Sequence, residues 1–129
     1  MLVHMTFDCG ALARAYWDTI EARDWGAFGE LLADDVVYEC PQTRERVRGR
    51  EAYVRFNREF PGDWHVQIVQ IVANEGRAVT WTSFKMDDGL DTGIAFLDFD
   101  PAGKIVKITD FWPEPYEPPT NRVHLVERY

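Results

Sequence analysis

Asp110 is the residue whose type and setting most clearly suggest chemistry. It follows Val106 and Ile108 at alternate positions and precedes Trp112, so all four share one face of an expected strand over residues 104–112. A carboxylate among apolar neighbours needs a partner or a raised pKa, and general bases are often tuned in this way. If the opposite face of this strand is the buried one, Asp110 instead lies in solvent near the strand end.

Tyr16 and His65 are two further candidates for proton transfer. Tyr16 shares a helical face with Leu12 and Ile20, so core packing alone would also explain its ring. His65 is the one histidine within the four consecutive strands expected over residues 64–112, and it could act as an acid or base beside a carboxylate. A lone histidine on a strand is more often exposed, and this alternative stays open.

Neither a metal nor another cofactor is indicated by the remaining donor residues. His4, His65 and His124 are widely separated, and Cys9 and Cys40 form neither a close pair nor a disulfide framework. We therefore expect chemistry that needs no cofactor.

Aromatic residues make up 14% of the chain, which is high for a protein with 22 acidic and 14 basic side chains. Together with Cys40 and with Asp91 near the expected mouth, several of them are candidates for the lining of an apolar pocket: Trp17, Phe56, Trp64, Trp81, Phe84 and Trp112. Cys40 could equally be a small buried hydrophobe, and Asp91 a solvated turn residue. A pocket of this kind would suit a small, flat, apolar molecule.

Length and charge limit the class of protein. The chain has 129 residues and a net charge of −8, which fits one domain and argues against binding to duplex nucleic acid. We expect a cytoplasmic protein without a membrane contact, because there is no secretory signal and no apolar run of about 20 residues.

The pattern along the chain is typical of an α+β domain. Helices are expected over about residues 8–23, 25–32 and 50–60, and strands over 36–39, 64–73, 77–86, 90–99 and 104–112, with turn signals such as Asp87-Asp88-Gly89 between the last four. Four consecutive strands form an antiparallel sheet that curls against the helices and leaves a pocket between them. We expect one domain over residues 1–112 and a proline-rich tail over 113–129 that packs on the domain or on a partner subunit. Its segment 123–126 is a candidate edge strand.

Three strings in this order resemble the nuclear transport factor 2-like superfamily, and within it the SnoaL-like polyketide cyclases. Residues 32–39 resemble the family's helix-to-strand junction, residues 49–52 the start of its third helix, and residues 99–106 its last hairpin. The resemblance covers about residues 8–112. It implies a cystatin-like fold, in which a cone-shaped curved sheet packs on three N-terminal helices. The sheet is expected to be antiparallel, with mixed pairing at an edge. The resemblance also implies a homodimer formed through the outer face of the sheet.

The resemblance also assigns roles to particular residues. Asp110 matches the acidic residue that moves the proton in SnoaL-like enzymes, and Tyr16 matches the tyrosine that donates a hydrogen bond to the oxyanion in ketosteroid isomerases. Two isomerase carboxylates are replaced, one by Cys40 and the other by Ala95. These replacements argue against steroid-type isomerisation by the same set of residues.

Two hypotheses of different classes follow. The first is a cofactor-free cyclase, isomerase or dehydratase that acts by proton transfer on an apolar, carbonyl-bearing molecule. The second is a non-catalytic ligand-binding or protein-association module on the same fold, because fold alone does not define activity.

Overall fold

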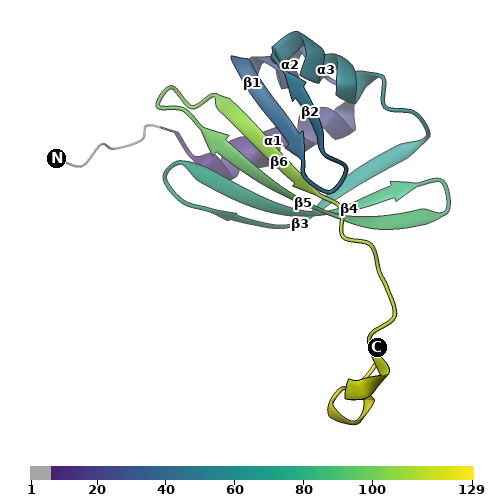
Figure 1. Cartoon of the computed structure of the whole chain (residues 1–129). Coiled ribbons are helices and arrows are strands. Elements are labelled where there is room, and N and C mark those ends of the chain that lie inside the picture. The colour runs from purple at the N-terminus through teal and green to yellow at the C-terminus, as the bar shows by residue number, and fades with distance from the viewer. Residues whose placement is uncertain (1–6) are drawn as a thin grey trace.

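The computed structural model describes residues 7–129, so His4 lies outside the described part. Two helices come first, and a third helix lies between the second and the third strand along the chain (Figure 1). The helices are α1 (Cys9–Ala22), α2 (Trp25–Glu30) and α3 (Arg50–Arg58). The strands are β1 (Leu32–Cys40), β2 (Glu45–Arg48), β3 (Trp64–Ala73), β4 (Arg77–Met86), β5 (Gly89–Phe99) and β6 (Ile105–Phe111).

Aspartate caps begin the first two helices. The Asp8 side chain accepts a hydrogen bond of 3.1 Å from the Ala11 amide, and Asp24 accepts one of 3.2 Å from the Ala27 amide. The second helix ends two residues earlier than its apolar pattern predicts, because Leu32 already pairs with Ile105 of β6. The strand expected over residues 36–39 is correspondingly longer.

The six strands form one sheet in the order β2-β1-β6-β5-β4-β3. The last four strands are an antiparallel meander, as the turn signals predict, and β2 is antiparallel to β1. β1 lies parallel to β6 inside the sheet, a long-range pairing that joins the two ends of the domain. The sheet is curved and its helices cover one face (Figure 1), so the α+β cone expected from the sequence is confirmed.

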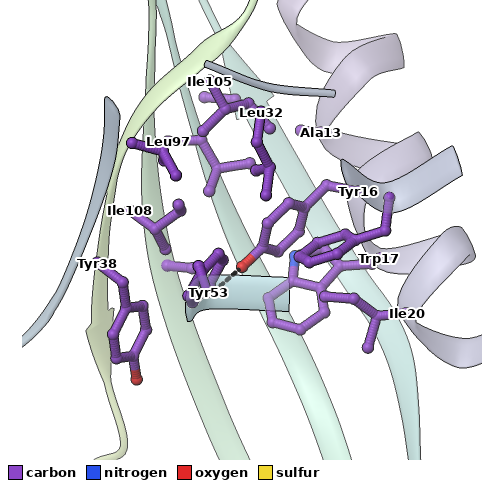
Figure 2. Close-up of a cluster of buried hydrophobic side chains, with 14 of the residues drawn as sticks. Ala13, Tyr16, Trp17, Ile20, Leu32, Tyr38, Tyr53, Leu97, Ile105 and Ile108 are labelled. Atoms are coloured by element: carbon purple, nitrogen blue, oxygen red, sulfur yellow. Dashed lines mark hydrogen bonds between the residues drawn. The ribbon is translucent and has the colours of Figure 1, made fainter. Parts of the chain in front are cut away.

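The core fills the space between α1 and the inner sheet face (Figure 2). Leu97 and Ile108 project from β5 and β6 toward Ala13 and Tyr16 of α1, and all four are fully or almost fully buried. This face of β6 is the one that also carries Asp110, because residues 108 and 110 alternate with the outward-facing Thr109.

The tail leaves the domain after β6 and runs away from the sheet (Figure 1). The edge strand expected over residues 123–126 is wrong, since Thr120–Leu125 forms a 3₁₀ helix and Val126 follows in extended conformation. Tyr116 and Leu125 in this tail are strongly exposed.

Between residues 7 and 129, no helix has the length and apolar composition needed to cross a membrane.

Candidate functional site

A cavity of about 360 Å³ opens between the inner face of the sheet, α1 and α3. Its polar lining includes Asp110 of β6, Tyr16 of α1, Tyr38 of β1 and Tyr53 of α3. The volume lies within the range of small-molecule sites. Four different elements therefore bring their hydroxyl and carboxyl groups to the lining of one cavity.

Asp110 lies inside this cavity and is only 6% exposed. Burial raises the pKa of its carboxyl from an ordinary value of 3.8 to about 7, although hydrogen bonds from Tyr38 and from the Trp112 side chain act in the opposite direction. The Tyr38 hydroxyl donates to Oδ2 of Asp110 over 3.0 Å. The alternative in which Asp110 lies in solvent is thus wrong. A carboxyl with a pKa near neutrality can both accept and donate a proton at physiological pH.

The hydroxyls of Tyr16 and Tyr53 form a short hydrogen bond at the inner end of the site (Figure 2). Both side chains are almost fully buried. Burial is the main cause that raises the pKa of each hydroxyl above its usual value, and the nearby Asp110 carboxyl raises both further. The two phenols therefore stay protonated and can act as hydrogen-bond donors.

Tyr38 connects the two parts of this network. Its ring stacks on that of Tyr53 with centroids 5.0 Å apart, while its hydroxyl bonds Asp110. The roles of Tyr38 and Tyr53 were not anticipated from the sequence. Tyr38 lies two residues before Cys40 on the same strand face, and this position could have indicated that it faces the cavity. Tyr53 lies on the apolar side of the third helix, which could have indicated that it is buried.

Five of the expected wall residues line the cavity: Trp17, Phe56, Trp64, Phe84 and Trp112. The rings of Phe84 and Trp112 meet edge to face at 5.3 Å, and Trp64 stacks on Phe84 at 5.7 Å. Gly93 makes this arrangement possible, since a Cβ at that position would lie 2.9 Å from the Trp112 ring. The floor of the site is therefore aromatic.

Cys40 and Asp91 also line the cavity, as expected from the sequence. Cys40 is buried, whereas Asp91 is exposed near the start of β5. Glu45 of β2 and Glu114 of the tail, which were not anticipated, lie in the same lining. The exposed acidic residues mark the mouth of the cavity.

His65 and Trp81 do not reach the site. The His65 side chain is 59% exposed, with Nδ1 2.8 Å from Oε2 of Glu21 and Nε2 3.4 Å from Oδ1 of Asp63. Trp81 is 46% exposed on the outer sheet face, because the alternating Thr80 and Thr82 occupy the inner positions of β4. The expected place of Trp81 in the pocket wall is wrong.

Within the described residues 7–129, no group of three histidine, cysteine or acidic side chains is arranged to hold a metal ion.

Sequence and structure comparisons agree on the family. The sequence model of the SnoaL-like domain matches residues 13–108, so the chain belongs to the SnoaL-like family, with the nuclear transport factor 2-like, cystatin-like fold. No functionally curated protein has significant sequence similarity to the chain.

Among solved structures, the chain is similar to a candidate ketosteroid isomerase from Kribbella flavida DSM 17836. The two are 46% identical, with 94% of this chain and 89% of that one covered and a TM-score of 0.91. A nuclear transport factor 2-like protein of unknown function from Burkholderia xenovorans LB400 is 23% identical over 94% of both chains, with a TM-score of 0.80. A candidate SnoaL-like polyketide cyclase from Shewanella denitrificans OS-217 is 16% identical, covers 81% of this chain and 90% of its own, and has a TM-score of 0.72. The last two likenesses concern the fold alone.

Proposed function

We propose that the protein is a cofactor-free enzyme that moves a proton on an apolar, carbonyl-bearing small molecule bound in the cavity. The observation that carries this proposal is the buried Asp110 carboxyl with a pKa near 7, placed in an aromatic cavity beside three tyrosine hydroxyls. Aldol-type cyclisation, isomerisation and dehydration share this first step. The name of the Kribbella protein is consistent with such chemistry.

In the proposed reaction, Asp110 removes a proton from the carbon next to the substrate carbonyl. The electron pair of that C–H bond forms a carbon–carbon double bond, and the carbonyl π electrons move to oxygen and give an enolate. Tyr16 donates a hydrogen bond to this oxygen, and Tyr53 holds the Tyr16 hydroxyl in place. Asp110 then returns the proton at the product position of an isomerisation, so the carboxylate that began the cycle is regenerated.

The test is exchange of the acidic C–H of cyclic ketones with deuterated solvent, followed by proton NMR, because this readout needs no knowledge of the natural product. Asp110→Asn should abolish exchange while the circular dichroism spectrum stays unchanged. Asp98→Asn is a matched control, since Asp98 lies on the outer face of β5 and pairs with Arg77. Full exchange activity in Asp110→Asn would overturn the mechanism.

A non-catalytic ligand-binding module is the second candidate. What favours it is that Cys40 and Ala95, both buried, occupy the positions where the resemblance to ketosteroid isomerases implies two carboxylates. Ketones that bind in the cavity with no exchange in the wild type would support this function.

We also propose that the protein forms a homodimer through the outer face of the sheet. Trp81 and Phe111 are exposed there, with Ile94 between them in the strand register. Apolar side chains gathered on an open sheet face favour association with a second copy.

A further inference from the structure

The charged residues of the cavity all have the same sign. Asp110 lies inside, and Asp91, Glu45 and Glu114 lie at the mouth, while no lysine, arginine or histidine of residues 7–129 takes part in the lining. The three mouth residues come from β5, β2 and the start of the tail. Different elements thus supply exposed carboxylates to the lining of the same cavity.

Protein groups do not neutralise the carboxylates at the mouth. Other carboxylates of this chain, such as Glu39 and Asp98, pair with arginine or lysine. Among the residues that the structure describes, Asp91, Glu45 and Glu114 have no ion-pair partner. Their negative potential is therefore directed at whatever enters the cavity.

Aromatic rings lie directly behind this mouth. Asp91 is the cross-strand partner of Phe84, and Phe84 contacts Trp112 and Phe60. Faces of aromatic rings attract cations and repel anions. One cation already touches this wall from outside: the Arg23 guanidinium lies 3.5 Å from the centroid of the Trp64 ring, where Glu21 also pairs with it.

We propose that the ligand of this cavity is an organic amine whose protonated nitrogen lies at the mouth between Asp91, Glu45 and Glu114. Its flat, apolar, carbonyl-bearing part extends past Phe84 and Trp112 toward Asp110. A carboxylate-bearing molecule of the same shape is disfavoured, because the mouth carries negative charge and no lysine, arginine or histidine of the described residues lines the cavity. This inference rests on the proposed function for the position of the carbonyl, whereas the charge preference of the mouth stands on the lining alone.

Three 2-acetylnaphthalenes that differ only in the group on the far ring provide the test: aminomethyl, methyl or carboxylate. Binding is measured by calorimetry and by quenching of tryptophan fluorescence. The aminomethyl compound should bind about tenfold more tightly than the methyl compound, and the carboxylate more weakly than both. The difference should shrink as the salt concentration rises, because exposed charges are screened.

The triple variant Glu45→Gln, Asp91→Asn and Glu114→Gln should remove the advantage of the amine, so that the aminomethyl and methyl compounds bind about equally. A matched variant with Asp18→Asn, Glu30→Gln and Glu75→Gln removes three exposed carboxylates outside the cavity and should keep the wild-type order. Tight binding of the carboxylate compound, or an order that the triple variant does not alter, would overturn the inference. If the three compounds bind in the expected order but the wild type catalyses no solvent exchange, the proposed catalysis is rejected and the inference about the amine stands.

Discussion

The Tyr38 hydroxyl donates a 3.0 Å hydrogen bond to Oδ2 of Asp110, and both groups are buried in the same cavity. Burial raises the pKa of Asp110 to about 7, and this hydrogen bond opposes the rise because it stabilises the charged carboxylate. Tyr38 therefore lowers the pH at which Asp110 becomes a base, against the larger effect of burial, without itself giving up a proton.

Tyr38→Phe should move the pH dependence of catalysis. In the wild type, kcat/KM for exchange should fall as the pH drops through about 7, because protonated Asp110 cannot accept a proton. Loss of a hydrogen bond to a charged group should raise the pKa of Asp110 and shift this midpoint upward by about one to two pH units. Tyr116→Phe in the exposed tail is the control. A midpoint that stays in place in Tyr38→Phe would show that the contact does not tune Asp110.

Asp110→Asn should stabilise the protein at high pH. Since the folded-state pKa of Asp110 is raised, its contribution to stability is fully present below pH 4 and is lost as the pH rises through about 7. Asparagine avoids the cost of a buried charge. The free energy of unfolding of the variant relative to the wild type should therefore increase by up to about 4 kcal/mol between pH 4 and 8. Urea unfolding at several pH values measures this, and a difference independent of pH would contradict the raised pKa.

Substitution of Tyr16 should lower kcat more than substitution of its hydrogen-bond partner Tyr53. Tyr16→Phe removes the proposed donor to the enolate oxygen, so kcat should fall by about 10²–10³. Tyr53→Phe should reduce kcat less, because Tyr53 acts by positioning Tyr16. Both variants remove one partner of a buried hydrogen bond and should lose about 1–3 kcal/mol of stability. If Tyr16→Phe loses the expected stability but keeps the wild-type rate, the hydrogen bond between Tyr16 and Tyr53 has only a structural role.

Local patterns were sufficient to predict most elements of this fold. The alternation around Asp110 and the turn signals each act over a few residues, and the meander β3 to β6 follows from them. The parallel pairing of β1 with β6 joins residues about 70 apart in the chain, and no local pattern encodes it. That pairing is what brings Tyr38 next to Asp110.

The candidate site was harder to predict for the same reason. Asp110 and Tyr16 were recognised from their chemistry and from the family resemblance, but Tyr53 looks in sequence like any aromatic residue on an apolar helix face. Its role depends on the distance between α1 and α3, which the packing of the whole core determines. Trp81 illustrates the opposite error, because an aromatic residue in a strand can face either side of the sheet.

His65→Gln tests whether the surface histidine takes part in the reaction. Its ring pairs with Glu21 and lies outside the cavity lining, so the exchange rate should remain unchanged. The loss of an exposed pair should cost less than about 1 kcal/mol of stability. Glu21→Gln should behave in the same way. A large loss of rate in His65→Gln, with intact binding of a ketone, would show that His65 takes part in the reaction.

Trp81→Glu tests the proposed dimer. A charge at the centre of the outer face would be buried without a partner in the dimer but would stay hydrated in the monomer, so it should shift the equilibrium toward the monomer. Sedimentation velocity over a range of concentrations measures this shift. Leu90→Glu is the matched control, because Leu90 is also apolar and exposed but lies at the start of β5, away from the register position of Trp81 opposite Ile94. A wild type that is monomeric at every concentration, or a Trp81→Glu variant that dimerises as the wild type does, would reject this face as the interface. Because Asp110 and Trp81 lie on opposite sheet faces, the monomeric variant should still catalyse exchange.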